Sequence, residues 1–331
     1  MTTRDEVFRA EARTALEVAA RASLRAPSVF NTQPWTWRLT GDVLELSSDP
    51  ARRLGVTDAE GRLLLLSCGG ALHHAQVSLA AAGWHADVQR LPEEQRPDLL
   101  ARVKVTKPSE PDVEAELLAA AISRRRTDRR AFGDRPVPEE ILTRLRRLVE
   151  ACGAYLHVVP DERVPELAIS VDQAADANYF DPAHRGELTG WTHRPAWTGD
   201  GVPPSTVVQP SQRRVPVRNF LPDGSSGLLP GADHDEGATF VIIFGTTDHP
   251  VDLLRGGEAM SALLLGATAD GLASAPISEA VEVAWPRRLL SRLLSGIGEP
   301  YLIVRLGYVE EPDEVPPTPR RSPSDVIFIE D

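Results

Sequence analysis

Residues 26–35, APSVFNTQPW, are the most informative stretch of the chain. They place two prolines, a serine, an asparagine and a glutamine between an amphipathic segment and an alternating one, TWRLT at 36–40. Proline fixes φ and removes a backbone donor, so we expect a rigid loop whose remaining N–H groups point outward. A rigid backbone beside small polar side chains suits a flat ligand with polar edges. The residues alone leave open a plain helix-to-strand connection rich in turn formers.

The composition is that of a globular protein. The 331 residues suffice for two domains or one large one, and 42% of them are hydrophobic. A formal net charge of −12 argues against nucleic acid or an anionic membrane surface as the main partner. Cys68 and Cys152 lie far apart without a CxxC motif, which argues against a disulfide framework and a zinc site.

The chain shows neither a signal-peptide core near its first residues nor an apolar run of 18 residues. We therefore expect a cytoplasmic protein with no membrane partner and no bound metal.

Apolar periodicity predicts the elements of the first half. Expected helices cover residues 3–24 and 61–82, and expected strands cover residues 36–40, 43–47 and 101–106. Four prolines between positions 92 and 111 predict a domain boundary near residue 110.

The second half contains the same kinds of element around a different central segment. Expected helices cover residues 112–125, 138–152, 165–179 and 253–269, and expected strands cover residues 155–159, 238–245 and 301–307. Residues 182–230 contain eight prolines, no periodicity and two tryptophans, Trp191 and Trp197. A long segment of this kind is either disordered or a functional lid, and its aromatic residues favour the lid.

The two halves share one helical pattern. Gly69–Trp84 aligns without gaps with Gly257–Leu272, and both segments begin with glycine and close on glycine plus a large apolar residue. This similarity suggests a duplicated unit.

Arg124–Arg130, RRRTDRR, contains five arginines in seven positions. If this segment is extended, Arg125, Thr127 and Arg129 share one face and present two guanidinium groups around a hydroxyl. That arrangement suits a phosphate monoester, because arginine binds phosphate oxygens bidentately. The alternative is a solvated helix end, where cations match the negative end of the helix dipole.

Two further segments carry weaker signals. Arg320 and Arg321 form a basic pair in PPTPRRSP, at 316–323, where exposure is the ordinary expectation. Residues 271–278, GLASAPIS, predict a small-residue loop after a helix, where the backbone could approach a ligand closely.

APSVFNTQPW, RRRTDRR and PPTPRRSP together resemble the nitroreductase flavoprotein family, in particular its Acg-like branch of tandem-domain FMN-binding proteins. Simple nitroreductases are homodimers with FMN at the subunit interface. One subunit supplies an RxSxR-type phosphate clamp, and the other supplies the APSxxNxQPW loop. This chain carries the loop in its first half and the clamp in its second, where CGAYLHVV stands in place of the loop.

The resemblance therefore implies an α+β fold of tandem nitroreductase-like domains, a pseudo-dimer with one complete FMN site. Each domain would pack a mixed or antiparallel sheet with helices. The implied domains are residues 1–110 and residues 111–331, with a lid inserted at 181–237.

The resemblance also implies which residues contact the phosphate and the pyrimidine edge of FMN. Arg125 and Thr127 would hold the phosphate, with Arg321 and Arg320 closing on it. Arg129 would reach the flavin near N1 and O2, where positive charge favours the anionic reduced form.

The remaining implied contacts lie along the ring and the ribityl chain. The loop residues that would face them are Pro27, Ser28, Val29 and Asn31. Ile277 and Ser278 would pass the ring near N5, where hydride is exchanged. The scheme requires no acid–base side chain, and we expect His73 and His74 to be packing or surface residues.

The implied function is an FMN-dependent oxidoreductase that transfers hydride, in ping-pong fashion, to a nitro compound or a quinone, with NAD(P)H as reductant. The alternative is an FMN-sequestering or stress-related protein with little NAD(P)H turnover, because a lid over the flavin would exclude a nicotinamide. A flavin dehydrogenase of a biosynthetic pathway is a third possibility. Trp191 and Trp197 would line the lid's inner face. The expected partner is a small molecule or none, for a chain that is a monomer or a homodimer.

Overall fold

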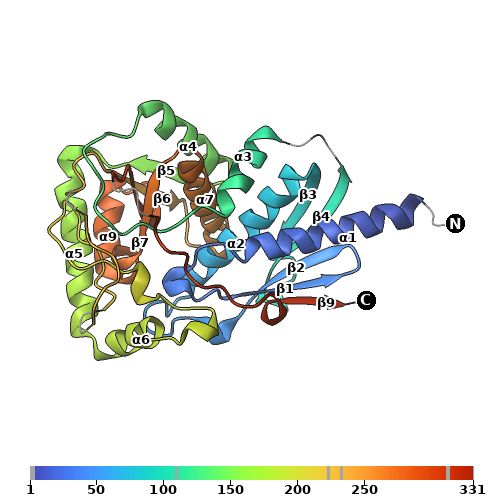
Figure 1. The fold of residues 1–331 in the computed structure, drawn as a ribbon, viewed down its shortest axis with the longest axis horizontal. Coiled ribbons are helices and arrows are strands. Elements are labelled where there is room, and N and C mark those ends of the chain that lie inside the picture. The colour runs from blue at the N-terminus through green and yellow to red at the C-terminus, as the bar shows by residue number, and fades with distance from the viewer. Residues whose placement is uncertain are drawn as a thin grey trace.

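The computed structural model describes residues 4–108, 110, 112–221, 224–231, 234–310 and 314–330. The fold is α+β with two sheets, which confirms the predicted class (Figure 1). The first sheet has five strands in the order β3-β4-β2-β1-β9, and the second has four in the order β5-β6-β8-β7. Every neighbouring pair is antiparallel except β1 and β9.

The first sheet is built mainly from the first third of the chain. Its elements are α1 (Arg4–Ser23), β1 (Trp35–Thr40), β2 (Val43–Ser48), α2 (Arg62–Ala81), β3 (Trp84–Arg90) and β4 (Leu99–Pro108). One face is apolar, since Trp37 lies opposite Leu46 and both are buried in a cluster with Leu16 of α1 and Leu72 of α2. The other face is polar, with Glu45 bonded to Arg102. This alternation is typical of an antiparallel sheet with one solvated face.

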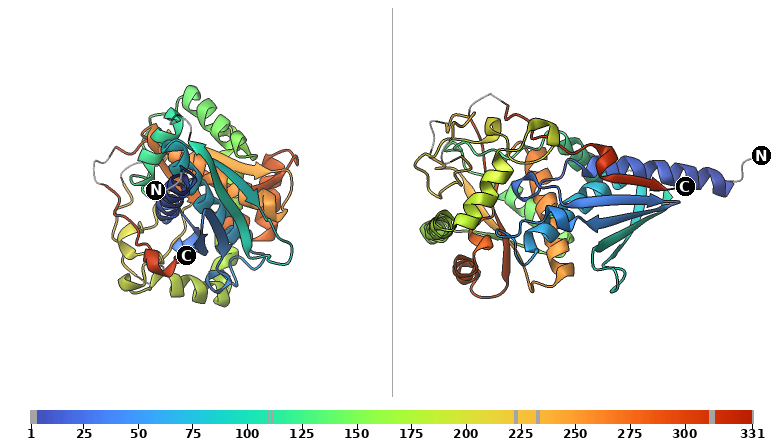
Figure 2. Two further views of the ribbon diagram at one scale, coloured as in Figure 1. Left: turned by 90° about the vertical axis from the view of Figure 1, so that its right-hand side faces the viewer. Right: turned by 90° about the horizontal axis from the view of Figure 1, so that it is seen from below.

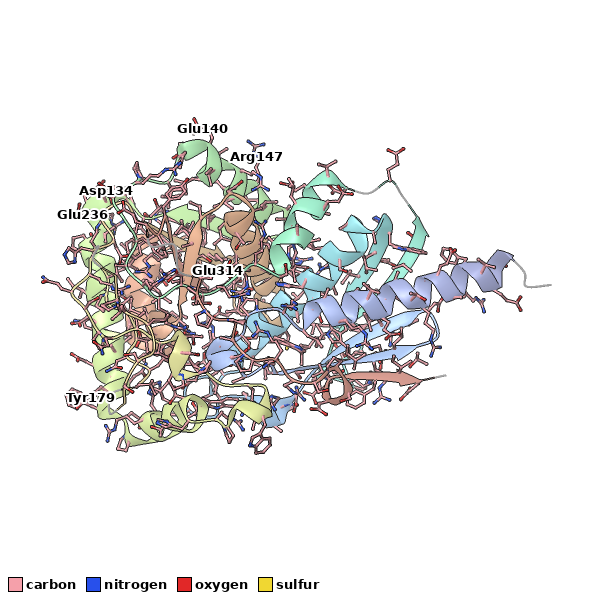
Figure 3. The ribbon with its side chains drawn as sticks, viewed as in Figure 1. Asp134, Glu140, Arg147, Tyr179, Glu236 and Glu314 are labelled. Atoms are coloured by element: carbon pink, nitrogen blue, oxygen red, sulfur yellow. The ribbon has the colours of Figure 1, made fainter. Side chains whose placement is uncertain are left out.

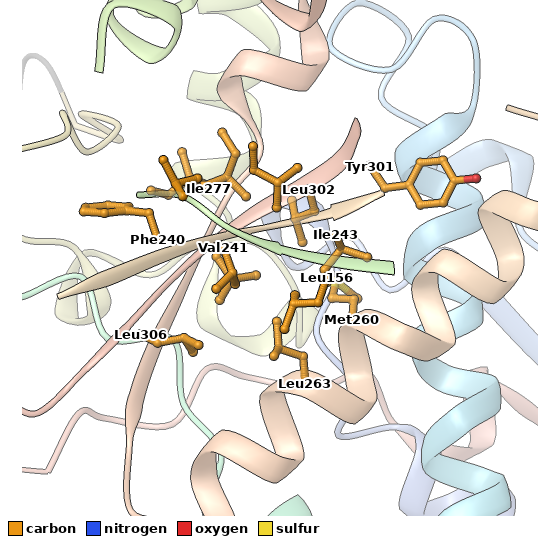
Figure 4. Close-up of a cluster of buried hydrophobic side chains, with 14 of the residues drawn as sticks. Leu156, Phe240, Val241, Ile243, Met260, Leu263, Ile277, Tyr301, Leu302 and Leu306 are labelled. Carbon is orange, nitrogen blue, oxygen red and sulfur yellow. The ribbon is translucent and has the colours of Figure 1, made fainter. Parts of the chain in front are cut away.

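The second sheet lies within a larger core. Its elements are α3 (Val113–Ile122), α4 (Glu139–Ala151), β5 (Tyr155–Val158), α5 (Val164–Phe180), α6 (Pro182–Thr192), β6 (Thr239–Gly245), α7 (Pro250–Ala269), β7 (Ala273–Ile277), α8 (Glu279–Glu282), α9 (Ala284–Leu293) and β8 (Glu299–Gly307). Strand β6 is buried along nearly its whole length, and its side chains join those of β8 and α7 in one cluster (Figure 4). Charged side chains such as Glu140 and Arg147 of α4 lie at the outer edge (Figure 3).

The C-terminal strand crosses back to the first sheet. Strand β9 (Ile327–Glu330) pairs in parallel with β1, with Ile327 opposite Trp37. The start of helix α1 and the end of strand β9 lie on the same side of the molecule (Figure 2). The expected range 111–331 placed this strand with the second half. The short sequence IFIE does not indicate which strand it pairs with, because so short a strand is stable only within a sheet formed by distant segments.

Helices α2 and α7 join the two halves at a very close crossing. A Cβ added at Gly69 would lie 2.0 Å from the carbonyl oxygen of Leu254, and one at Gly257 would lie 2.0 Å from that of Leu66. Each leucine precedes the glycine of its own helix by three residues, so the two contacts are reciprocal. The helices thus meet at positions that the sequence alignment also matches. The duplication itself stays a prediction.

Among the helices that the structure describes, α2 is long and apolar enough to cross a membrane, judged by its length and composition. However, 72% of its apolar window is buried inside the protein, which is typical of a helix in a protein core.

Two predicted segments differ from the structure. The helix expected at 112–125 ends at Ile122, so the arginine-rich segment leaves the helix before its clamp residues. Residues 273–277, expected in a loop, form strand β7, because they pair with β8 from Ala273 to Ile277. Small residues predict that a ligand or another backbone approaches closely, and in the structure the backbone of strand β8 does so.

Candidate functional site

One cavity lies between residues of the two halves. It holds about 620 Å³ of empty space, including solvent at its mouth, which is within the range of small-molecule sites. The predicted residues that line it are Pro27, Ser28, Val29, Thr127, Arg129 and Ser278. The first three come from the loop after α1, and the others come from the arginine-rich segment and the end of β7. The cavity therefore brings together three segments that the sequence singled out.

The loop of the first half is held in an unusual backbone conformation. Phe30, Asn31 and Gln33 have φ values of 48°, 54° and 50°, in the left-handed region that non-glycine residues rarely adopt. The Ser28 hydroxyl accepts a hydrogen bond from the Gln33 N–H at 2.9 Å, which closes the turn. Such conformations persist only where surrounding contacts fix them, and they are common at ligand sites.

Asn31 anchors this loop rather than lining the cavity. Its Nδ2 donates to the carbonyl oxygens of Gly201 and Pro319, each at 3.0 Å, and its Oδ1 accepts from Arg320 Nη1 at 3.2 Å. The buried amide thus ties together the loop, the 181–237 segment and the C-terminal segment. Its predicted contact with a ligand is not tested by this geometry.

Arg125 is a buried cation without a counter-charge. Its side chain belongs to a residue that is 5% exposed, and its Nε and Nη1 atoms are buried without a hydrogen-bond partner. Burial, together with neighbouring Arg126, lowers its pKa to about 10. An uncompensated buried charge costs several kcal/mol, so the site favours an anion.

Arg320 extends this positive region. Burial is the largest cause that lowers its pKa, to about 9, and the charges of Arg125, Arg25 and Arg126 lower it further. Its Nη1 and Nη2 donate to Thr318, Asn31 and backbone oxygens, whereas its Nε is buried without an acceptor. No carboxylate is paired with Arg125 or Arg320 among the described residues. In a chain of net charge −12, this local cluster of cations favours an anion.

Arg129 contributes a third cation, half-buried and at the cavity itself. Its guanidinium lies 4.6 Å from the ring centroid of Phe220, and its Nη1 donates to the Thr206 carbonyl at 3.0 Å. Burial and the charge of Arg218 lower its pKa to about 10. Asp128, next to Arg129 in sequence, is bonded instead to Arg130 at 2.7 Å.

No protein-family model matches the chain, but similar sequences do. A Mycobacterium tuberculosis protein (strain H37Rv) named as an NAD(P)H nitroreductase is 40% identical over 309 residues, covering 92% of this chain and 88% of the relative. The Acg protein of the same organism, also named as an NAD(P)H nitroreductase, is 34% identical over 317 residues, covering 95% of each chain. The chain belongs to the nitroreductase flavoprotein family, in its Acg-like branch.

Solved nitroreductases overlay on part of this Acg-like chain. An FMN- and NADPH-dependent nitroreductase from a Sphingopyxis species covers 65% of this chain and 99% of its own, at 20% identity and a TM-score of 0.40. A Bacteroides fragilis nitroreductase with bound FMN covers 59% and 90%, at 16% identity and a TM-score of 0.37. Both TM-scores lie below 0.5, so the family assignment depends on the sequence relatives.

The predicted site residues that do not line this cavity are Asn31, Arg125, Ile277, Arg320 and Arg321, and their contacts with a ligand stay predictions. For two of them, Arg321 and Ile277, the structure shows where the side chain is held. Arg321 donates from Nη1 to the carbonyl oxygens of Gln33 and Trp35, at 3.1 and 3.3 Å, and from Nη2 to that of Asp325. It holds the end of the loop, and Arg320 is the member of the pair beside Arg125. Adjacent residues of an extended segment point in opposite directions, which the sequence alone could not resolve.

Ile277 is the second such residue. Its side chain is buried in the core of the second sheet (Figure 4), while Pro276 and Ser278 line the cavity. Side chains alternate along β7, so its neighbours face the opposite side. His73 and His74 do not line the cavity; the Nδ1 of each lies within 2.9 Å of the Ser261 hydroxyl oxygen.

The 181–237 segment packs over the loop of the first half. Phe220 lines the cavity and contacts Phe30 edge-on, with ring centroids 6.0 Å apart. Trp191 packs against the same apolar cluster, as expected. Trp197 was expected on the inner face and is 86% exposed, so that prediction is wrong. Whether the segment acts as a lid stays a prediction.

Sequence reasoning missed several residues that line the cavity. They are Phe30, Leu63, Leu66, Ser67, Phe220, Met260, Pro276 and Leu302. The leucines, Met260 and Ser67 lie on helices or strands whose apolar pattern indicates core. Phe30 and Pro276 could have been named from the sequence, since they lie inside the quoted segments 26–35 and 271–278.

Proposed function

We propose that this chain binds one FMN in the cavity between its halves and acts as a nitroreductase-like oxidoreductase. The observation that carries the proposal is the buried Arg125 beside Arg320, neither paired with a carboxylate among the described residues. Arg125 precedes by two residues Thr127, which lines the cavity together with the family's loop. The phosphate of FMN supplies the missing negative charge. The names of the relatives support NAD(P)H as the reductant.

The residues present fit each part of the cofactor. Arg125, Arg320 and Thr127 would hold the phosphate through charge-assisted hydrogen bonds and a hydroxyl. The loop residues from Pro27 to Val29 would support the ring, with Ser278 across the cavity. FMN, when bound, supplies hydride exchange between NAD(P)H and a small electrophile such as a nitro compound or a quinone.

Arg129 would tune that chemistry. It keeps a positive charge in a site partly closed from water, and its guanidinium is fixed between Phe220 and the Thr206 carbonyl. A fixed cation beside the pyrimidine edge stabilises negative charge that develops there.

Binding of FMN and of riboflavin by Arg125→Ala tests the phosphate assignment, since riboflavin lacks the phosphate. A charge-assisted hydrogen bond contributes about 1.5–3 kcal/mol, so FMN affinity should fall about 10- to 100-fold while riboflavin affinity changes little. Arg124→Ala is the control, because Arg124 is exposed in the same segment. Purified protein that is colourless and takes up no added FMN would refute the proposal.

A second function, flavin sequestration, is favoured by the packing of the 181–237 segment. Phe220, Leu188 and Val207 form a cluster with Phe30, and Gly199 O accepts a hydrogen bond from Gln33 Nε2 at 2.9 Å. A segment bonded in this way would keep a nicotinamide from stacking on the flavin.

Anaerobic mixing of the flavin-loaded protein with NADPH separates the two functions. Rapid bleaching of the flavin absorbance indicates a reductase. Failure to bleach, with reduction by dithionite intact, indicates sequestration.

A further inference from the structure

A buried cluster of ionisable residues lies directly behind the cavity and takes no part in the function proposed above. Arg218 contacts two carboxylates of α8, with Nη2 at 2.6 Å from Glu282 and Nε at 3.2 Å from Glu279. The side chains of all three are at most 7% exposed. His184 of α6 lies 3.9 Å from Glu282.

The cluster has one more carboxylate than it has cations. Burial lowers the pKa of His184, and the charge of Arg218 lowers it further, so this imidazole is neutral. Burial raises the pKa of Glu279 to about 7, against the attraction of Arg218 and with the repulsion of Glu282. Glu279 therefore keeps a proton up to near neutral pH, although it shares the guanidinium of Arg218 with Glu282.

Charged and titratable groups face this pair from each surrounding element. They are His184 on α6, Arg218 in the 181–237 segment, Asp176 on α5 and Asp58 before α2. Burial is the largest cause that raises the pKa of Asp58, and the charge of Glu282 raises it further.

The pair is connected to the cavity by one hydroxyl. Ser278 donates from its Oγ to Glu282 Oε1 at 2.7 Å, and Ser278 also lines the cavity between the halves. The hydrogen bond spans one helical turn, because α8 begins directly after Ser278.

The pair is connected to solvent on its other side. A second cavity, between α5 and α6, is lined by Glu279, Arg218, His184 and Tyr179 and holds about 740 Å³ including open solvent. Tyr179 is 60% exposed and points outward at the edge of the molecule (Figure 3). Protons can thus enter from solvent on one side of the pair and leave through Ser278 on the other.

We propose that Glu279, Glu282 and Ser278 form a proton relay that serves the cavity between the halves. The proposal rests on the proposed function, because a hydride acceptor bound there needs a proton as well. For a nitro compound, one hydride and one proton convert the nitro group to a dihydroxyamine, which loses water to give the nitroso product. The hydride derives from NAD(P)H, and the proton passes from the carboxylate pair through the Ser278 hydroxyl to the substrate oxygen. Solvent then reprotonates the pair.

The first test measures whether the buried carboxyl group is protonated, without any reaction. Infrared spectra of the protein should show a carboxyl carbonyl band that disappears as pH rises through about 7. Glu279→Gln should remove this band, and Asp176→Asn, which changes an exposed carboxylate of the same cavity, should keep it. A spectrum without such a band, or a band unchanged in Glu279→Gln, would overturn the proposal. The band is expected even in protein that binds no FMN, so failure of the proposed function is seen separately.

The second test measures delivery. Flavin-loaded protein, reduced anaerobically with dithionite, is mixed with 4-nitrobenzoate, and reoxidation is followed in a single turnover. General acid catalysis contributes about 100- to 10,000-fold, so Ser278→Ala and Glu279→Gln should slow reoxidation by about 100-fold or more. The FMN content of Glu279→Gln, whose side chain does not line this cavity, should remain that of the wild type. The wild-type rate should fall above about pH 7, where the pair has lost its proton. An unchanged rate in Ser278→Ala, a small change that leaves the fold intact, would contradict the relay.

Discussion

Arg320 donates a hydrogen bond from Nη1 to Oδ1 of Asn31 at 3.2 Å, although 289 residues separate them in the chain. The same arginine has its pKa lowered by burial and then by the charge of Arg125, so it lies beside both the loop and the clamp segment. One side chain thus links the two sequence signals from which the site was inferred.

Arg320→Ala should weaken FMN binding by about 10-fold or more, because it removes both a cation near the phosphate and a support of the loop. Arg320→Lys keeps the charge and should recover part of the loss. Fluorescence titration with FMN measures both. Equal FMN affinity in all three proteins would show that Arg320 plays no part in anion binding.

Gly69→Ala should destabilise the protein by more than the usual 1–3 kcal/mol of an overpacked site, since its Cβ would meet a backbone oxygen at 2.0 Å. Gly70→Ala is the matched control, one residue further along α2. Its Cβ would meet the flexible end of Met260 at 3.2 Å, and backbone oxygens only at the ordinary contact distances of 3.7 and 3.8 Å. Urea unfolding of the two variants compares them directly, and similar losses would contradict the close crossing.

Glu258→Ala should destabilise the protein by about 1–3 kcal/mol, because it leaves the half-buried Arg90 without its bidentate partner, bonded at 2.7 Å. The ion pair lines a cavity of its own, together with His73, Gln76 and Cys152. Arg96→Ala, which breaks an exposed pair with Glu45, should cost at most about 1 kcal/mol. Thermal unfolding with calorimetry measures both variants.

Phe220→Ala should speed reduction of the bound flavin by NADPH if the 181–237 segment restricts access, because Phe220 lines the cavity and contacts Phe30. Trp197→Ala changes an exposed aromatic residue of the same segment and should leave the rate unchanged. Anaerobic stopped-flow absorbance gives both rates. Identical rates in wild type and Phe220→Ala would argue that this aromatic side chain is no barrier.

Stability should decrease as pH rises toward 7, and Glu279→Gln should remove part of that dependence. Burial raises the pKa of Glu279 from 4.5 to about 7, so the folded state binds this proton more tightly than the unfolded state. Its contribution of about 3 kcal/mol is complete below pH 4.5 and is lost as pH rises through 7. Urea unfolding of both proteins at several pH values in this window measures the difference, and parallel curves would contradict the assignment.

The sequence indicated the class of fold and the segments of the site, but less often the residue within a segment. The loop at 26–35 and the alternation of Thr127 and Arg129 were recognisable because their chemistry is local. The sequence did not show where the side chains of Ile277 and Arg321 lie, because the direction of a side chain in an extended segment depends on which face its partners cover. Phe220 gave no signal, since its role arises only when a distant segment folds over Phe30.

The reciprocal contact of Gly69 and Gly257 has a consequence for divergence among relatives. Backbone meets backbone there, so the angle between the halves does not depend on the sizes of neighbouring side chains. We therefore expect relatives to keep glycine at both positions, since a side chain at either would push apart the helices that carry Leu66 and Met260 to the cavity.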